Sequence, residues 1–248
     1  MAVVDLKLYT KSYLFSSPYR TVTASAEDTG NEGKYSIDGD RFTYFSGTAA
    51  GLTVTYYMGP TSRDLTHILY NWNFTDVDIE WSTDGAAWSG PTTFSGLTAT
   101  AGKLAFANTA KYIRLSNISV SAGAKAIIYE IAPVTYIDAI DGTCINKLDL
   151  PDFTDQGLQT ERTWRGGIVP SFENIHRGVV GVTLQQLTDA QVLAIETAAR
   201  NNNKVTVIPN ETAHPELWYN CFWSQINLPH AKKREEGRGG QVSWTECD

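Results

Sequence analysis

The sequence predicts a mainly β protein, with an N-terminal β-sandwich followed by a small α+β domain that has one main helix on an antiparallel sheet. Two observations carry this prediction. Gly, Tyr and Trp number 20, 12 and 7 among 248 residues, a balance that suits strands and turns better than helices. Short apolar runs, divided by Gly, Asn and Asp turns, recur along residues 1–140, which is typical of a sandwich or barrel.

Alternating apolar positions define the strands of the N-terminal part. The clearest runs are 51–59, 67–82, 111–120 and 124–134. Because alternate residues of a strand point to the same face, each run offers one apolar face to a core. The inward residues expected from this pattern are Leu52, Val54, Tyr56, Ile68, Tyr70, Trp72, Val77, Ile79, Trp81, Ile113, Leu115 and Ile118. Trp72 and Trp81 are therefore interpreted as core residues.

The composition changes near residue 140, where segment 138–167 is polar and rich in turn residues. We place the domain boundary there, which gives a sandwich over 1–145 and the α+β domain over 146–248. Thr188 and Gln191 have the spacing of a capping box, which predicts that a helix begins at this point. The helix pattern continues with Val192, Ile195 and Ala199 and ends at Asn201 to Asn203. Strands are expected at 178–187, 204–210, 217–228 and 239–247.

Charge and hydropathy exclude several classes of partner and location. The net charge of −7 argues against a broad basic face for nucleic acid. No apolar run reaches the roughly 18 residues of a membrane span, and the N-terminus lacks the pattern of a signal peptide. We expect synthesis in a cytoplasm, and free thiols at the three widely spaced cysteines, Cys144, Cys221 and Cys247.

Motifs of catalysis and cofactor binding are not found in the sequence. The four histidines form neither HExxH nor HxH, and there is no phosphate-binding loop, nucleotide fingerprint or G-x-S-x-G. Carboxylates at 27–32 and at the C-terminus would have to face each other across a cleft to act in a glycosidase. We therefore expect a protein that is not an enzyme and needs no cofactor.

The segment VDIEWSTDGAAWSG, residues 77–90, predicts a hairpin. Asp84 and Gly85 supply the positive φ that a tight turn needs. Trp81 and Trp88 lie on either side of the turn, where they could pack as a cross-strand pair.

Three motifs resemble the discoidin group of galactose-binding-like jelly rolls. They are YSIDGDRFTYFSG at 35–47, DVDIEWSTDGAAWS at 76–89 and AKYIRLSNI at 110–118, in that order. The resemblance implies a jelly roll whose variable loops at one end are where such modules bind sugars. The flanking cysteine pair of many extracellular members is missing here.

Tyr44, Phe45 and Trp88 are the candidate glycan contacts, because an aromatic ring can hold the face of a sugar. Packing in the core is the alternative for each of them. Asp38 and Asp40 form a D-x-D pair, but the following residues lack the ligand spacing of an EF-hand loop. A structural role is favoured for this pair, and we predict no metal site.

The C-terminal part resembles the small strand–helix–strand domains of tailed-bacteriophage tail and baseplate proteins. The resemblance rests on RTWRGGIVPSF, the LTDAQ that opens the helix, VTVIPN and LWYNCFW. It implies a non-enzymatic structural component of a phage virion, in the tail or baseplate. Such a component would assemble with other virion proteins as a homo-oligomeric ring, after synthesis in the bacterial host cytoplasm. The alternative is a carbohydrate-binding module for attachment to host-surface glycans.

Basic residues of the second domain are the candidate subunit contacts. They are Arg162, Arg165, Arg177, Lys232, Lys233, Arg234 and Arg238. The last four lie in a charged loop that would order against an acidic neighbour. The alternative for this loop is a solvated hairpin tip.

Overall fold

The computed structural model describes residues 6–16, 18–38, 43–140, 144–149, 159–162, 168–171, 179–202, 204–211, 218–228 and 238–246. The helices are Tyr13–Ser16 (α1), the 3-10 helix Gly33–Ser36 (η1) and Asp189–Asn201 (α2). The first ten strands are Leu6–Thr10 (β1), Thr21–Ala24 (β2), Phe45–Gly47 (β3), Val54–Tyr57 (β4), Arg63–Trp72 (β5), Phe74–Ser82 (β6), Ser89–Phe94 (β7), Ala101–Ala110 (β8), Tyr112–Val120 (β9) and Ala126–Val134 (β10). The others are Tyr136–Ile140 (β11), Ile145–Asp149 (β12), Gln159–Arg162 (β13), Ile168–Ser171 (β14), Val179–Leu187 (β15), Lys204–Ile208 (β16), Tyr219–Asn227 (β17) and Arg238–Glu246 (β18).

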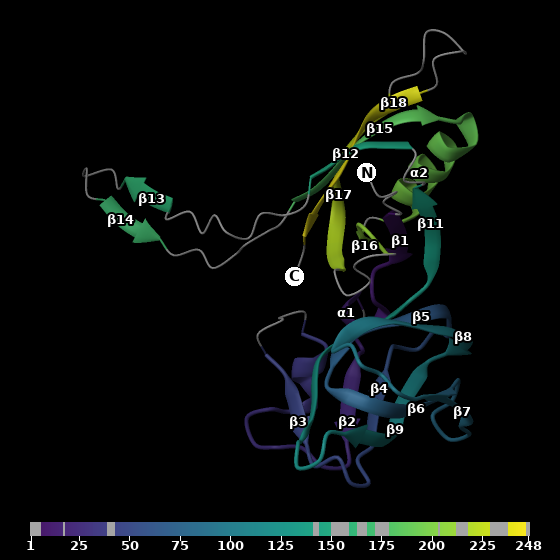
Figure 1. The fold of residues 1–248 in the computed structure, drawn as a ribbon, viewed down its shortest axis with the longest axis vertical. Helices are drawn as coiled ribbons and strands as arrows, with labels where there is room; N and C mark the ends of the chain where they lie inside the picture. The colour runs from purple at the N-terminus through teal and green to yellow at the C-terminus, as the bar shows by residue number, and fades with distance from the viewer. Residues whose placement is uncertain are drawn as a thin grey trace.

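Two antiparallel sheets form the jelly roll in the lower half of Figure 1. The first has the strand order β2-β4-β9-β6-β7 and the second β3-β10-β5-β8. Their inner faces share one apolar core, in which Trp72 is completely buried and stacks between Tyr70 and Phe74 at 4.4 and 4.9 Å. The predicted β-sandwich and its inward positions are confirmed, except that Trp81 is only partly buried at the edge of the core.

The second sheet system contains seven strands in the order β11-β1-β16-β17-β18-β15-β12. In a flat sheet, six spacings of about 4.8 Å would place β11 and β12 about 29 Å apart. The five residue steps from Ile140 at the end of β11 to Ile145 at the start of β12 reach about 18 Å at most. The sheet therefore curls toward a barrel. Its apolar interior includes Val192 and Ile195 of α2, and α2 also contacts β11 (Figure 1).

The helix α2 begins where the sequence predicts. Thr188 is its N-cap, and the capping box with Gln191 is complete in both directions. Val192, Ile195 and Ala198 are its buried residues, so the third inward position is Ala198 and not the predicted Ala199. The helix ends at Asn201, with Asn202 as its C-cap. The prediction of one main helix on an antiparallel sheet is confirmed.

The jelly roll is inserted between two neighbouring strands of the curled sheet. β1 pairs with β11 on one side and with β16 on the other, and both pairs are antiparallel. The residues between β1 and β11 build the jelly roll. Strand pairing thus differs from the predicted division near residue 145, because residues 6–10 and 136–140 belong to the second sheet. The alternating pattern of a strand does not say which sheet the strand joins.

A small apolar cluster connects the two halves of the molecule. It contains residues from β1, β5, β10 and β16, together with Trp218. Its members are Tyr9, Leu69, Ala132, Val134, Ile208 and Trp218, all of them buried. The jelly roll and the curled sheet therefore share a packed junction in addition to the two chain crossings.

Candidate functional site

One row of residues crosses the outer face of the five-stranded sheet. Thr21 of β2 is paired with Tyr57 of β4, and Tyr57 is paired with Tyr112 of β9. Directly paired residues share one face of a sheet. The adjacent residues Tyr56 and Ile113 are completely buried, so alternation turns Tyr57 and Tyr112 outward.

These outward rings form a continuous aromatic surface with Trp88, which directly precedes β7. Tyr57 and Tyr112 stack with ring centroids 4.7 Å apart. Trp88 meets Tyr112 edge to face at 6.5 Å. All three side chains are partly exposed, and together they are called the outer aromatic row below. The row places ring surface in contact with solvent on a sheet face, where most neighbours are polar.

An ion pair fixes the position of Trp88. The guanidinium carbon of Arg114 lies 4.2 Å from the centroid of the Trp88 ring. Arg114 donates to both carboxylate oxygens of Glu80, from Nε and Nη2, at 2.8 Å each. Hydrogen bonds from Arg114 hold the pKa of Glu80 below its usual range. The pair is therefore charged at neutral pH, and Arg114 is held under the Trp88 ring before any ligand arrives.

The turn between Trp81 and Trp88 is satisfied by its own hydrogen bonds. The Ser82 hydroxyl oxygen accepts from the backbone N–H groups of Asp84 and Gly85, at 3.2 and 2.8 Å. The Asp84 carboxylate accepts from the backbone N–H groups of Ala86 and Ala87, at 2.8 and 2.9 Å. Gly85 has a φ of +80° and lies against the Tyr112 ring. The predicted Asp-Gly turn is confirmed, and the Asp84 carboxylate stabilises the loop through these hydrogen bonds.

The expected pairing of Trp81 with Trp88 is wrong. Trp81 is paired with Ser89 across the hairpin, so Trp88 is offset by one residue and points to the opposite face. Trp81 packs inward, edge to face on Phe106 at 5.5 Å. Trp88 lies outward over Arg114 and Tyr112.

The other two predicted glycan contacts are not part of this surface. Phe45 is completely buried, so its assignment as a glycan contact is wrong; it belongs to the short strand β3 and faces the core. Tyr44 is partly exposed, with its ring 5.6 Å from that of Tyr129 on β10. Tyr44 thus lies with the four-stranded sheet and Trp88 with the five-stranded sheet. Tyr57 and Tyr112 were missed, although their outward positions in alternating strands were visible in the sequence.

The remaining candidates are described only in part. Asp38 accepts a hydrogen bond from the Thr43 hydroxyl at 2.7 Å, whereas Asp40 lies outside the described residues. Within the described ranges, no group of three or more His, Cys, Asp and Glu residues is placed to hold a metal ion. Five of the predicted subunit contacts lie outside the described residues, namely Arg165, Arg177, Lys232, Lys233 and Arg234. Arg162 and Arg238 are described only as positions in β13 and β18. Cys144 and Cys221 are buried and form no disulfide, and Cys247 is not described.

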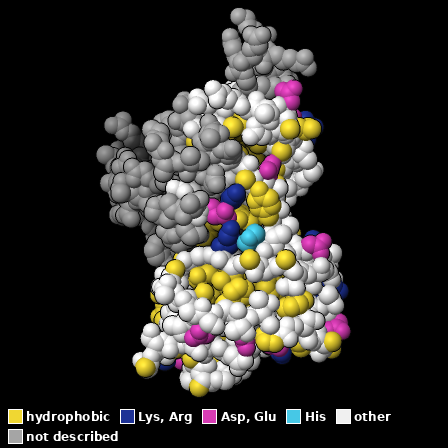
Figure 2. Space-filling view, turned by 45° about the vertical axis from the view of Figure 1, so that its right-hand side comes forward, with side chains coloured by type: hydrophobic (Ala, Val, Ile, Leu, Met, Phe, Trp, Pro, Cys, Tyr) yellow, Lys and Arg dark blue, Asp and Glu magenta, His cyan; other side chains and the backbone are white. Residues whose placement is uncertain are grey.

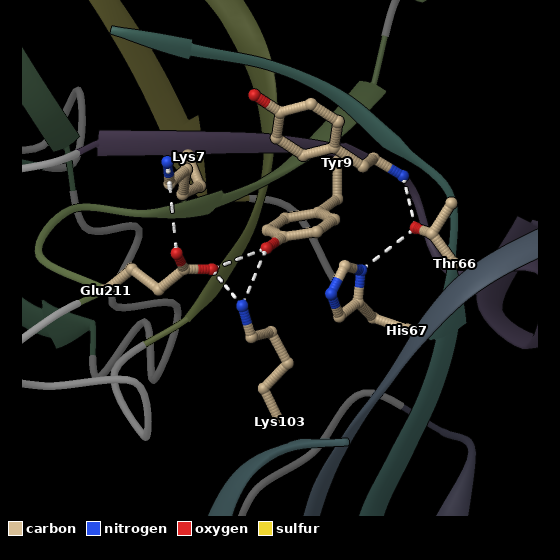
Figure 3. Close-up of polar contacts among 7 residues, drawn as sticks. Lys7, Tyr9, Thr66, His67, Lys103 and Glu211 are labelled. Atoms are coloured by element: carbon tan, nitrogen blue, oxygen red, sulfur yellow. Dashed lines mark hydrogen bonds and ion pairs between the residues drawn. The ribbon is translucent and has the colours of Figure 1, made fainter. Parts of the chain in front are cut away.

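A second polar cluster lies at the junction of the two halves (Figures 2 and 3). The Tyr9 hydroxyl donates to Glu211 at 2.6 Å. Lys103, from the jelly roll, forms an ion pair with the same carboxylate, and its Nζ also donates to the Tyr9 hydroxyl at 3.4 Å. Lys7 of β1 approaches Glu211 at 4.0 Å. We call these residues, with His67, the junction cluster.

The groups of the junction cluster set one another's protonation states. Burial alone would raise the pKa of Glu211, but hydrogen bonds from Lys103 and Tyr9 outweigh it and lower the pKa. Burial, followed by the positive charge of Lys103, lowers the pKa of His67 below 6.5. His67 Nδ1 lies 2.9 Å from the Thr66 hydroxyl oxygen, and its ring meets Tyr9 at 5.3 Å. The neutral histidine and the paired charges join the two halves.

No protein-family model matches the sequence, and neither does any curated protein. Among solved structures, chitosan-binding module 1 from a chitosanase/glucanase of Paenibacillus sp. IK-5 is 20% identical, with a TM-score of 0.45 over 51% of this chain and 98% of that chain. The CBM32 module of AlyQ, in complex with 4,5-unsaturated mannuronic acid, is 29% identical, with a TM-score of 0.40 over 46% and 92% of the two chains. The family 32 module of Clostridium perfringens NanJ, in complex with galactose, is 17% identical, with a TM-score of 0.41 over 51% and 98%. These structural neighbours are carbohydrate-binding modules.

In the described part of the chain, no helix has the length and apolar character needed to cross a membrane.

Proposed function

We propose that the jelly roll is a carbohydrate-binding module and that the outer aromatic row is its contact surface. The observation that carries the proposal is the partly exposed Trp88 ring, held by Arg114 at 4.2 Å and placed edge to face on Tyr112. A sugar presents C–H groups on one face and hydroxyls at its rim, so an aromatic ring beside polar groups matches both.

Preorganisation favours binding at this surface. Fixing a side chain on binding costs about 0.5–1.5 kcal/mol when the chain is free beforehand. Trp88 is already confined by Arg114, and Arg114 is confined by Glu80. The Ser116 hydroxyl, which donates to Glu80 at 3.1 Å, adds a polar group beside the rings. A ligand would meet an ordered mixture of ring faces, cation and hydroxyl.

Two carboxylates near the outer aromatic row favour a binding function over a catalytic one. Glu80 and Asp78 lie two residues apart on β6, as a pair of acidic groups near the row. Each is already engaged, Glu80 with Arg114 and Asp78 as acceptor from the Asn117 amide at 2.6 Å. A general acid of a glycosidase needs a raised pKa, whereas the pKa of Glu80 is lowered.

The test is glycan binding by the full chain, screened on an array and quantified by calorimetry. Trp88→Ala should lower affinity for a bound glycan by about 1–3 kcal/mol, the value of an aromatic contact. Tyr44→Ala is the matched control, because it removes a partly exposed ring from the other sheet. Equal losses in the two variants, or no glycan bound by the native chain, would refute the proposal.

A role as a virion component of a tailed phage is the second candidate. The observation that favours it is the element order β15–α2–β16–β17–β18, which has the strand and helix order of the tail and baseplate resemblance. In this reading the second domain assembles with other virion proteins and the jelly roll attaches to a host-surface glycan. Deleting residues 231–238 should leave the protein folded but reduce its incorporation into particles. Normal occupancy and infectivity would refute the assigned contact loop.

A further inference from the structure

A hollow of about 470 Å³ lies at the edge of the jelly roll, at the start of β2. Its lining includes Arg20, Thr21, Lys34, Tyr35 and Asp38. The 3-10 helix η1 forms one wall and packs closely on β2. The volume falls within the range of about 300–1,000 Å³ that is usual for small-ligand sites.

The two cations of this hollow retain donors for a ligand. Arg20 donates from Nη1 to the carbonyl oxygen of Leu14 at 3.0 Å, and no further partner of its guanidinium occurs in the described part of the chain. Lys34 lies 4.9 Å from the centroid of the Tyr35 ring and 3.4 Å from Glu32, with 68% of its side chain exposed. An ion pair with this exposure is worth little, so an incoming anion can replace Glu32 as the partner of Lys34.

The charges of the lining favour an anion over a cation. Among the lining residues Arg20 and Lys34 carry two positive charges and Asp38 carries one negative charge, which gives +1 once a ligand has replaced Glu32 as the partner of Lys34. The Asp38 carboxylate already accepts a hydrogen bond from Thr43. Tyr35 adds a partly exposed ring against which a sugar face can lie.

Thr21 connects this hollow with the outer aromatic row. It lines the hollow, and it is also paired with Tyr57, the first ring of the row. The two strand spacings from Thr21 through Tyr57 to Tyr112 amount to about 10 Å. An elongated ligand on the row therefore reaches the hollow at its β2 end.

We propose that the hollow binds the carboxylate of an acidic sugar, and that the ligand of the jelly roll is a uronic-acid-containing polysaccharide. Arg20 and Lys34 would bind the carboxylate, Tyr35 would contact the ring, and the adjoining sugars would lie on the outer aromatic row. This inference rests on the proposed function and adds the chemical class of the glycan.

The experiment compares oligogalacturonate with the same oligosaccharide after its carboxyl groups have been reduced to neutral alcohols. Calorimetry on the full chain should show at least about tenfold weaker binding of the reduced form, because charge-assisted hydrogen bonds are lost. Lys34→Gln should weaken binding of the acidic form about three- to tenfold and leave binding of the reduced form unchanged.

Lys125→Gln is the matched control, since Lys125 is similarly exposed and also paired with a carboxylate, Asp28 at 2.9 Å. It should bind both forms as the native chain does. Equal binding of the two forms, with an affinity that still depends on Trp88, would overturn the carboxylate site proposed for the hollow. It would leave the outer aromatic row standing as the contact surface. Failure of both forms and of the whole glycan array to bind would overturn the proposed function as well.

Discussion

The outer aromatic row and the junction cluster are built from similar residues and differ in what they leave available. Both have tyrosine next to an ion pair: Arg114–Glu80 lies beside the row, and Lys103–Glu211 lies with Tyr9 in the junction cluster. In the row the aromatic side chains remain partly exposed. At the junction the Tyr9 ring is 1% exposed and its hydroxyl donates to the glutamate. The same chemistry presents a surface in one place and joins two halves in the other.

The difference lies in which neighbours reach each ion pair. Glu80 and Arg114 are partners on adjacent strands of one sheet, and the Trp88 ring of the same sheet lies over Arg114. Glu211 follows β16 of the curled sheet, whereas Lys103 comes from the jelly roll. The two pairs are similarly exposed, at 22% and 18% for Lys103 and Glu211 and 29% and 19% for Arg114 and Glu80. They differ in that the junction pair connects two packed units, and removing one partner of a partly buried pair leaves the other charge uncompensated. Stability measurements should therefore separate the two regions.

The largest effect is expected from Tyr9→Ala. This change removes a buried ring from the apolar cluster between the halves and should cost about 3–5 kcal/mol in the free energy of unfolding. Urea denaturation followed by circular dichroism measures it. Tyr57→Ala in the row is the comparison, with an expected cost of about 1 kcal/mol because the ring is partly exposed. Similar losses in the free energy of unfolding for the two variants would contradict the distinction between the junction cluster and the outer aromatic row.

Glu211→Gln should have the next largest effect, a loss of about 1–3 kcal/mol in the free energy of unfolding at neutral pH. The neutral amide leaves Lys103 without its counter-charge in a partly buried place, since the two side chains are 22% and 18% exposed. The control is Glu196→Gln in the exposed helical pair with Arg200, for which the loss should stay below about 0.5 kcal/mol. A control as damaging as the junction variant would contradict the role given to Glu211.

Glu80→Gln tests the row without removing a ring. Arg114 would lose its charged partner and hold Trp88 less firmly, so affinity for a bound glycan should fall by about 1 kcal/mol. Calorimetry with a ligand selected on the array measures this change. Unchanged affinity, beside a loss for Trp88→Ala, would mean that the ion pair does not position the ring.

The smallest effect concerns pH. The pKa of His67 in the folded protein lies below its ordinary value of 6.5, so the unfolded chain binds the proton more readily. Its contribution to stability is complete above pH 6.5 and is lost as the pH falls through the folded pKa. Glu211, with a pKa below 4.5, loses its contribution only at lower pH. Between pH 7 and 5, His67→Gln should therefore lose stability less steeply than the native chain in parallel denaturation series.

Local patterns predicted the local structure well. The capping box of Thr188 and Gln191 located the start of α2, and alternation identified the inward faces of β4, β5, β6 and β9. These features depend on residues within a few positions of one another. Phe45 was misjudged because β3 has only three residues, which is too short for its alternation to be recognised.

Long-range pairing could not be predicted in the same way. Tyr9 and Glu211 are 202 residues apart, and nothing in either local sequence indicates the other. The outer aromatic row depends on the register of β2, β4 and β9, since a shift by one residue would turn its rings inward. The membership of β1 and β11 in the curled sheet depends likewise on partners elsewhere in the chain.

The insertion of the jelly roll between β1 and β11 has a mechanical consequence. A pull on a glycan held at the sheet face would be transmitted through both chain crossings at once. β1 is hydrogen-bonded on both sides, to β11 and β16, whereas β11 is an edge strand paired with β1 alone. Under rising tension the edge strand should peel away first, while β1 keeps the module attached. Because the two crossings act in parallel, β1 would then carry the whole load, and the jelly roll would separate from the curled sheet only when the pairs of β1 with β16 also open.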